Sequence, residues 1–543
     1  MKKITTFLQE EIDHFTWKDF VTIGIVVLLY GILSFYKLGD LKAPNTFYRE
    51  QVSQEIVFSF EEDIDFDKML FFNGEENSKF NLYLSDDNEK FIFFKKVEAR
   101  GTFTWNEVPF KKNTHYIKLV PTEETSLGEV AFYDLKGNYI PYSSYNEYLM
   151  DEVDLIPDHL SYMNSSYFDE VYFARTAYEY VQGMRHYEWT HPPLGKLIQA
   201  FPIYVFGYFS PFLYRLMGNI AGICMVFVMY FLGGVFFKRR GYALLSALFM
   251  AFDTFHFAHT RMGTVDSHLV LFIMCSALFM LLYTKKDNTL YLFLSGIFFG
   301  LSICVKWTGL YAGVALAIVY FAYFIMKKKD LMESIVKGSV FFVVIPLVFY
   351  CSCYFLFPNN YYYTDTFENL ISEQKEMYNY HSNLDAEHFF SSKWYTWPIS
   401  YKPVWYYQQQ LSEVKEETIS GVGNLILWIG GIIGVFYCLY LVFLKKDKDA
   451  CFLLFFFFSL WLPYAFIGRI MFLYHYFPVL PFLFLMVVSL LKGITEKMHW
   501  KWVIPVYLFL VILFFILYYP IVSGASISYN WKDKLELFDS WYF

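Results

Sequence analysis

The chain has 543 residues, of which 56% are hydrophobic, 23% are aromatic and only 18% are charged. Long uncharged runs in so apolar a chain exclude an ordinary soluble domain and indicate an integral membrane protein. The formal net charge of −8 does not predict an acidic partner, because acidic and basic residues are segregated along the chain, and no basic stretch with interleaved aromatic residues predicts nucleic-acid binding.

About eleven stretches are long and apolar enough to cross a bilayer, which takes about 20 residues per helix. When these spans alternate, the Lys and Arg clusters between them all fall on the side that holds Lys2 and Lys3. The positive-inside rule then predicts a multi-pass cell-membrane protein with a cytoplasmic N-terminus and an extracytoplasmic C-terminus. The spans are expected near 20–37, 213–237, 241–258, 265–284, 288–305, 308–326, 335–357, 422–444, 451–468, 472–491 and 503–523.

The spans divide the chain into successive parts. Residues 194–210 are apolar but contain Pro202, so we expect an interfacial helix there rather than a further span. The parts are 1–37, a cytoplasmic tail with the first span; 38–150, an extracytoplasmic β insert; 151–212, a first outer loop; 213–357, spans two to seven; 358–421, an extracytoplasmic loop rich in aromatic residues; 422–523, spans eight to eleven; and 524–543, an extracytoplasmic tail.

The insert 38–150 is typical of a small β-sandwich. Short runs such as VFSFEEDI and HYIKLV place β-branched and aromatic residues at alternating positions, and turn residues such as Asn73-Gly74 separate the runs. Through HYIKLV and LGEVAFYDLKGNYI the insert resembles discoidin-type jelly rolls. Both a structural spacer and a ligand-binding module fit this pattern.

Asp169 and Glu170 precede a helix-like segment at the outer mouth of the predicted bundle. One interpretation is structural, because acids at a helix N-terminus interact favourably with the helix dipole. The other is catalytic, because a carboxylate near apolar surroundings can have a raised pKa and accept a proton. The turn His191-Pro192-Pro193 then fixes where the chain reverses, since proline cannot continue a helix.

Further polar residues gather at the outer ends of the spans, where ionisable groups are functional candidates. The cations Arg215, Arg261, Lys306 and Arg469 would suit a lipid-linked phosphate, since Arg offers bidentate hydrogen bonds to phosphate oxygens. Snorkelling of long side chains to the interface is the alternative for one or two of them. The pocket candidates beside them are His191, Asp266, Trp307, His381, His388, Trp397, Tyr474 and His475.

No metal-binding pattern is evident in the sequence. His191, His381 and His475 share no ligand spacing such as HExxH, and the seven cysteines lie in or beside apolar runs. We therefore expect no metal site and no required cofactor, with a divalent metal as the alternative.

Seven motifs, in order, resemble the protein O-mannosyltransferases, which are polyprenyl-phosphate-sugar-dependent glycosyltransferases of the GT-C fold. The resemblance implies that Asp169 activates the acceptor hydroxyl with support from Glu170. It also implies that Arg469, Lys306 and Arg215 stabilise the departing lipid phosphate, and that Arg261 and His475 line the pocket. The motifs are FDE at 168–170, THPPLGK at 190–196, YRLMGN at 214–219, RMGTVD at 261–266, VKWTG at 305–309, MYNYHSNLDAEHFFSSKWYTWP at 377–398 and GRIMFLYHYFP at 468–478.

The family resemblance implies an inverting transfer of a mannosyl or other hexosyl residue. The donor would be a polyprenyl-phosphate sugar among the membrane lipids, and the acceptor a Ser or Thr of an exported protein. Loop 358–421 is too short for the MIR domain of eukaryotic members, so we expect a bacterial branch with its own insert. The alternatives are a GT-C enzyme that glycosylates a lipid or cell-wall glycan and, less well matched, a transporter of lipid-linked sugars; the oligomeric state stays open.

Overall fold

The computed structural model describes residues 10–12, 14–50, 54–144, 146–356 and 366–543. The chain forms two compact units. The helical unit comprises Met1–Tyr36, Gly183–Ile198 and Leu216–Phe543, and the sheet unit comprises Lys37–Gln182 and Gln199–Arg215. The sheet unit is therefore larger than the predicted insert, because it also takes in the chain that follows the strands.

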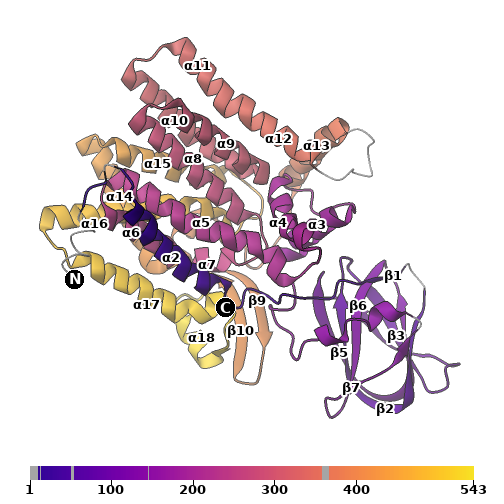
Figure 1. The fold of residues 1–543 in the computed structure, drawn as a ribbon. Coiled ribbons are helices and arrows are strands. Elements are labelled where there is room, and N and C mark those ends of the chain that lie inside the picture. The colour runs from indigo at the N-terminus through magenta and orange to yellow at the C-terminus, as the bar shows by residue number, and fades with distance from the viewer. Residues whose placement is uncertain (1–9, 13, 51–53, 145, 357–365) are drawn as a thin grey trace. The chain divides into compact units, whose positions relative to one another are not determined.

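Long apolar helices joined by short turns build the helical unit (Figure 1). Several start at a side-chain cap: Asn288, Asp330 and Asp447 each accept a hydrogen bond from a backbone N–H of the first turn. The helices are α2 (Trp17–Phe35), α6 (Arg240–Ala251), α7 (Thr254–Thr260), α8 (Asp266–Lys286), α9 (Thr289–Val305), α10 (Leu310–Lys327), α11 (Leu331–Ser339), α12 (Ile345–Phe355), α13 (Thr366–Asn383), α14 (Leu425–Lys445), α15 (Lys448–Trp461), α16 (Leu480–Met498), α17 (Val503–Ser523) and α18 (Tyr529–Leu535). Two more, α4 (Leu194–Phe206) and α5 (Pro211–Phe237), contain residues of both units.

Nine helices in the described part of the chain are long and apolar enough to cross a membrane. This confirms the prediction of a multi-pass helical membrane protein. The predicted span 241–258 is instead the pair α6 and α7, bent by 59°, and the predicted span 288–305 is the shorter helix α9. Asp253 stands at the bend: it caps α7 by accepting from His256 N (2.9 Å), and its other oxygen accepts from Trp428 Nε1 (2.9 Å).

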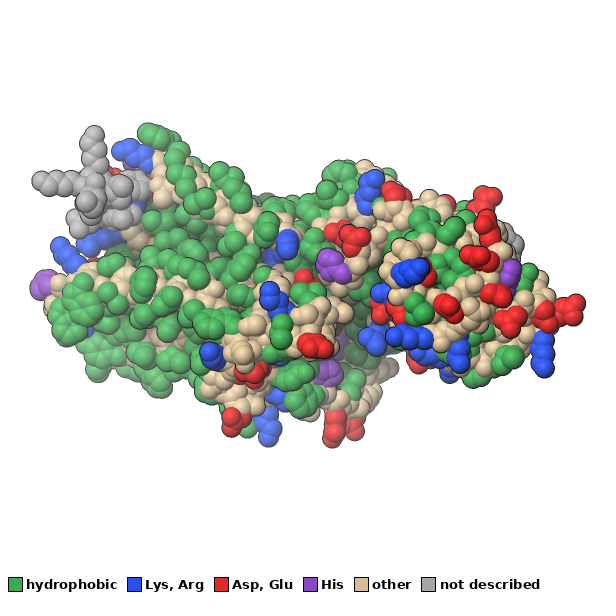
Figure 2. Space-filling view, turned by 90° about the horizontal axis from the view of Figure 1, so that it is seen from below, with side chains coloured by type: hydrophobic (Ala, Val, Ile, Leu, Met, Phe, Trp, Pro, Cys, Tyr) green, Lys and Arg blue, Asp and Glu red, His purple; other side chains and the backbone are tan. Residues whose placement is uncertain are grey.

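The surfaces of the two units differ in chemistry. Figure 2 shows hydrophobic side chains over much of the visible face of the helical unit, and charged side chains crowded on the part that holds the strands. Exposed apolar residues of the helical unit include Leu28, Leu29, Phe436, Phe443 and Phe509. Contiguous apolar surface of this kind marks an interaction site on a soluble protein, and here it is the surface expected of helices that face lipid.

The sheet unit contains strands along the predicted insert, so the prediction of a β domain there is confirmed. Its strands form one continuous hydrogen-bonded sheet, in the order β1-β6-β2-β5-β3-β4, with β7 beside β6 and β8 beside β2. The two longest strands, β2 and β5, pair along most of their length, and their register shifts between Ser59 and Ile64 and between Phe66 and Lys68. The strands are β1 (Tyr48–Glu50), β2 (Ile56–Asn73), β3 (Lys79–Ser85), β4 (Ile92–Glu98), β5 (Thr104–Pro121), β6 (Thr125–Asp134), β7 (Tyr139–Ile140) and β8 (Ser143–Ser144).

The core of the sheet unit is aromatic and aliphatic. Phe58, Phe66, Phe80, Ile117 and Leu119 are fully buried in it. These residues alternate with outward-facing ones along the strands, as expected for a sheet with one buried face. The helix α3 (Glu170–Gln182) belongs to the same unit.

The predicted aromatic loop 358–421 is described from residue 366 and contains regular structure. After α13 come a 3₁₀ turn at Trp394–Ile399 and the strands β9 (Val404–Gln410) and β10 (Lys415–Gly421). β10 also pairs with β11 (Ile527–Ser528) of the C-terminal tail. The tail is therefore hydrogen-bonded to the loop, which a reading of either segment alone did not predict.

Candidate active site

Asp169 and Glu170 lie at the start of α3, directly after a strained residue. Phe168 has a φ of +51°, a left-handed conformation that a bulky side chain rarely adopts. The Asp169 carbonyl accepts a hydrogen bond from Phe173 N (3.1 Å), so the helical hydrogen bonds begin there. Asp169 is half-buried and Glu170 is fully buried. The two adjacent acids therefore have different environments.

Glu170 forms a buried bidentate ion pair with Arg215. Arg215 Nε donates to Glu170 Oε1 and Arg215 Nη2 donates to Glu170 Oε2, both at 2.7 Å. The remaining N–H groups donate to the carbonyls of Leu38 (3.0 Å), Tyr162 (2.8 Å) and Ser165 (2.9 Å). A guanidinium has five N–H donors, so all of them are used within the sheet unit. In this structure Arg215 orients Glu170 and the surrounding loops, and its predicted contact with a donor phosphate stays a prediction.

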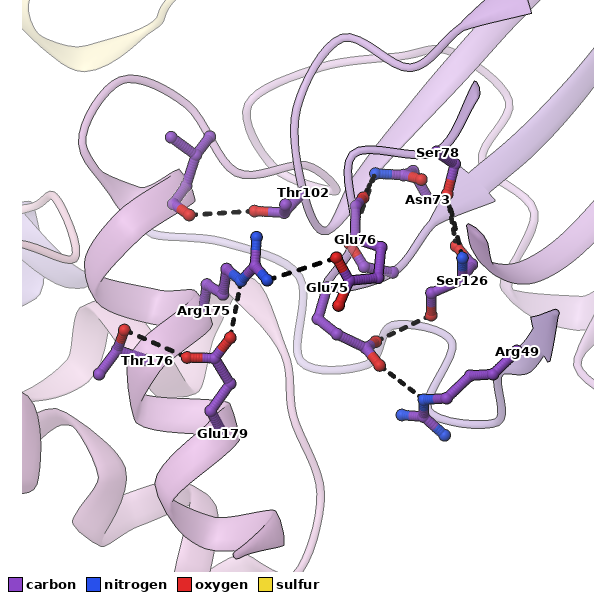
Figure 3. A network of polar contacts seen from close by, with 12 residues as sticks. Arg49, Asn73, Glu75, Glu76, Ser78, Thr102, Ser126, Arg175, Thr176 and Glu179 are labelled. Carbon is purple, nitrogen blue, oxygen red and sulfur yellow. Dashed lines mark hydrogen bonds and ion pairs between the residues drawn. The ribbon is translucent and has the colours of Figure 1, made fainter. Parts of the chain in front are cut away.

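A polar network holds α3 to loops of the sheet unit (Figure 3). Arg175 Nε donates to Glu179 Oε1 at 2.7 Å, and Arg175 Nη2 lies 3.5 Å from Glu76 Oε2 in the loop between β2 and β3. Thr102 Oγ1, in the loop between β4 and β5, donates to the Val171 carbonyl at 3.1 Å. These contacts fix the helix that carries the acid pair to the strands that precede it in the chain.

In the helical unit, an ion pair that the sequence did not predict closes the THPPLGK loop. Lys196 Nζ donates to Glu188 Oε2 (2.6 Å), to the Glu188 carbonyl (2.6 Å) and to the His191 carbonyl (2.8 Å). Glu188 Oε1 lies 3.0 Å from His191 Nδ1 and accepts from Thr190 N at 2.9 Å. Burial alone raises the pKa of Glu188, but Lys196 and His191 outweigh it and hold that pKa well below its usual range. Burial lowers the pKa of His191, so this ring is neutral at pH 7.

Lys306 and Asp266 form a second buried ion pair, beside a row of aromatic rings. Lys306 Nζ lies 3.0 Å from Asp266 Oδ1 and 5.5 Å from the centre of the Tyr474 ring. The row consists of four rings stacked at successive centroid distances of 5.9, 4.7 and 5.9 Å, which belong to His259, Tyr474, His475 and Trp397. Turns and helix ends far apart in the sequence therefore bring together five of the predicted site residues, which are Asp266, Lys306, Trp397, Tyr474 and His475.

Sequence reasoning missed His259. Its Nδ1 lies 2.9 Å from the Tyr406 hydroxyl, and its Nε2 lies 3.8 Å from Asp266 Oδ2. His259 precedes the RMGTVD motif by two residues, so its position beside a motif was the available signal. Glu188 likewise precedes the THPPLGK motif by two residues, so the same signal was available for it.

A third group connects the loop at His191 to α13. His381 Nε2 lies 2.8 Å from the Thr190 carbonyl, and the His381 ring lies 5.7 Å from that of His191 and 6.1 Å from that of Trp307. Trp307 Nε1 donates to the Tyr350 hydroxyl at 2.9 Å. Burial, together with the charges of His191 and Arg469, lowers the pKa of His381 to about 4. These histidines therefore act as neutral hydrogen-bonding groups at pH 7.

Arg261 donates hydrogen bonds to backbone carbonyls at the ends of two helices. Its N–H groups donate to the carbonyls of Ser34 (3.0 Å), Tyr36 (2.8 Å) and Ser523 (3.2 Å). Those carbonyls lie at the C-terminal ends of α2 and α17, and Arg261 itself follows the last residue of α7. A cation at helix C-termini satisfies carbonyls that have no partner within the helix. Arg261 therefore joins helix ends, and its predicted place in a phosphate pocket stays a prediction.

Arg469 lies in an open groove of about 960 Å³ in the helical unit. His388, also predicted for the site, lines the same groove. Arg469 forms no ion pair with an acidic residue in the described part of the chain. Other lining residues are Lys393, Trp394, Lys402 and Met471. Of the predicted phosphate-binding cations, Arg469 is thus the one in an open, water-accessible position.

Two family models match successive parts of this chain. The model described as dolichyl-phosphate-mannose-protein mannosyltransferase matches residues 190–352. The model of the C-terminal four-transmembrane region of protein O-mannosyltransferase matches residues 366–541, so together the two cover more than half of the chain. The chain belongs to the protein O-mannosyltransferase family. The first match begins at the THPPLGK loop, and the two include every predicted site residue except Asp169 and Glu170.

Relatives and a solved structure agree with this family. A polyprenol-phosphate-mannose–protein mannosyltransferase of Mycolicibacterium smegmatis is 23% identical over 430 residues, which cover 65% of this chain and 81% of the relative. The enzyme of the same description from Corynebacterium glutamicum is 21% identical over 422 residues, with the same coverage. The protein O-mannosyltransferase Pmt1-Pmt2 complex of S. cerevisiae, solved with its sugar donor, is 14% identical with a TM-score of 0.62, covering 70% of this chain and 89% of that one. This likeness shows that the family member described here has the GT-C fold.

Proposed function

We propose that this chain transfers a mannosyl residue from a polyprenyl-phosphate carrier to Ser or Thr hydroxyls of exported proteins. Family membership over two successive matched regions is the observation that carries this proposal. The buried Lys306–Asp266 pair beside stacked rings, and the open groove with Arg469, supply cationic groups of the kind that a lipid-linked phosphate requires.

The reaction exchanges one bond at the anomeric carbon for another. The bond from that carbon to the phosphate oxygen breaks, a bond to the acceptor oxygen forms on the opposite face, and polyprenyl phosphate leaves. We assign the acceptor's proton to the carboxylate of Asp169, which is half-buried and directly follows the strained residue Phe168. Glu170, saturated by Arg215, has a structural role.

Negative charge develops on the departing phosphate, and preorganised cations stabilise it most where water is excluded. We assign this task to Lys306 and Arg469, in place of the four cations first expected. Lys306 is held by Asp266 and lies against the Tyr474 ring, so its ammonium group is fixed before the donor arrives. We place the site on the extracytoplasmic side, following the positive-inside rule.

The test is transfer from radiolabelled polyprenyl-phosphate mannose in membranes that contain the wild-type chain or the Asp169→Asn variant. Label should enter the protein fraction with wild type, and it should fall by about 10²-fold or more in the variant, the size of effect typical for a general base. Asp86→Asn, which changes an exposed acid in the turn between β3 and β4 by the same one charge, is the matched control and should keep most of the activity.

Each other outcome has a definite meaning. Label in lipid or glycan alone would reject a protein acceptor and favour the GT-C alternative. Full activity of Asp169→Asn would remove this residue from the catalytic role, while leaving the transferase assignment intact. If neither fraction is labelled although the protein is folded, mannose is not the donor sugar.

A further inference from the structure

Three acidic side chains meet in the sheet unit, outside the residues assigned to transfer. They are Glu129 on β6, and Asp151 and Glu152 in the segment that leaves the strands. One carboxylate oxygen from each lies within 4.8 Å of the other two. No Lys, Arg or His in the described part of the chain forms an ion pair with any of the three. Such a group of like charges needs a counter-charge.

Glu129 is the member that points to a ligand. Its side chain is fully buried, its Oε1 accepts a hydrogen bond from Glu152 N (2.5 Å), and its Oε2 is buried without a hydrogen-bond partner. A buried carboxylate oxygen without a hydrogen-bond partner destabilises the folded state, because it has lost its hydrogen bonds to water and gained none in the protein. The structure therefore contains a buried oxygen, next to two further carboxylates, that accepts no hydrogen bond from the described part of the chain.

We propose that Glu129, Asp151 and Glu152 bind a calcium ion. Calcium is a hard cation that takes oxygen ligands from carboxylates, backbone carbonyls and water in flexible geometry. Magnesium instead prefers one or two carboxylates together with phosphates or several waters. Three carboxylates without a phosphate, one of them exposed where water can complete the shell, fit calcium better.

The surrounding hydrogen bonds orient two of the ligands. Glu152 Oε2 accepts from Asn45 N (2.8 Å) and Thr46 N (3.1 Å). Thr46 Oγ1 lies 2.8 Å from this oxygen and 2.9 Å from Asp151 Oδ1. A hydroxyl has a single proton, so it can donate to only one of these two oxygens at a time. Burial, with the neighbouring acids, raises the pKa of Glu129 to about 8, so a bound proton is the competing way to remove the repulsion.

The position of the ion would make it a clamp. Thr46 belongs to the chain entering the strands, Glu129 to a central strand, and Glu152 to the chain leaving them. Asn45 also accepts from Phe209 N (2.7 Å) and donates through Nδ2 to the Phe209 carbonyl (3.0 Å). One cation would thus connect the segment before the strands, the strand β6 and the segment after the strands, and its loss would destabilise the sheet unit.

Calcium binding can be measured directly on the full-length protein in detergent, which is first freed of metal with a chelator. After Ca²⁺ is added back and the free ion is dialysed away, wild type should retain calcium, as measured by mass spectrometry of the metal. Its Tm should rise by several degrees as Ca²⁺ is added, because a ligand that binds the folded state stabilises it. Glu129→Gln and Asp151→Asn should each lose both the bound calcium and the shift. Asp151 is exposed, so its variant remains informative if Glu129→Gln does not fold.

Glu147→Gln is the matched control, because Glu147 is an exposed acid in the same segment and its change alters the net charge equally. It should keep calcium and the full Tm shift. The proposal is wrong if wild type binds no calcium, which would favour the proton, or if binding survives both ligand variants. A Tm shift with Mg²⁺ but not Ca²⁺ would also overturn the assignment of the ion.

Discussion

At the scale of single residues, neighbours in the sequence can have opposite surroundings. Asp169 is half-buried, whereas Glu170 is fully buried and held by Arg215 through two hydrogen bonds. The pair Asp-Glu alone could not separate these roles, because the partner of Glu170, Arg215, lies 45 positions further along the chain. We therefore propose a positioning role for Glu170 and keep Asp169 as the candidate base.

This division predicts different outcomes for two adjacent substitutions. Glu170→Gln leaves the buried guanidinium of Arg215 without its counter-charge, a change that typically costs about 3–5 kcal/mol, so the Tm of the purified protein should fall by several degrees. Asp169→Asn should unfold close to the wild-type temperature while losing transfer activity. Thermal unfolding of both variants in the same detergent measures the difference, and an unchanged Tm of Glu170→Gln would contradict the structural role.

At the scale of elements, close packing positions the site residues. Gly195 lies in the first turn of α4, and an added Cβ there would lie 2.7 Å from Val265 Cγ1 and 2.8 Å from Val265 Cβ. Val265 directly precedes α8, whose first residue is Asp266, the partner of Lys306. The glycine of THPPLGK is therefore explained by contact between two elements rather than by a turn conformation.

Gly195→Ala should force these elements apart. Overpacking of this kind typically costs about 1–3 kcal/mol, so we expect a lower Tm together with reduced transfer, because the Lys306–Asp266 pair would shift. Gly24→Ala in α2 is the control, since an added Cβ meets nothing within 4 Å there, and alanine favours a helix by about 1 kcal/mol over glycine. If the two variants have the same Tm and the same transfer activity, the side chain of Val265 can move aside without cost and the prediction is wrong.

At the scale of the whole molecule, the structure predicts that acid weakens the helical unit. The pKa of His381 is about 4 in the folded chain, below the value of about 6.5 for a free histidine. The unfolded chain therefore takes up the proton first, so stability is lost as the pH falls from about 6.5 towards 4. His191, Lys306 and Arg469 face this ring and oppose its charge.

Unfolding temperatures at pH 7.5 and pH 5 test this prediction. Wild type should lose several degrees between them. His381→Gln should lose less, because its neutral amide can still donate to the Thr190 carbonyl and has no proton to take up. A variant with the same pH dependence as wild type would place the acid sensitivity elsewhere in the molecule.

The sequence by itself determined the apolar spans, the β insert and the family. Spans and strands follow from local periodicity and length, and motifs are short enough to survive at 23% identity. The break at Asp253 was less visible, because the polar contacts that bend α6 and α7 come from the start of α14. The pairing of β10 with β11 likewise joins segments more than a hundred residues apart.

Only the tertiary structure decided what the charged residues do. Arg261 and Arg215 look like phosphate ligands in the sequence, yet one joins helix ends and the other is saturated by Glu170 and backbone carbonyls. Glu188 carries no motif, yet it closes the loop through Lys196. A charge acquires its role from its partners and its burial, and both are set by long-range packing, whereas apolar length and periodicity are already present in the local sequence.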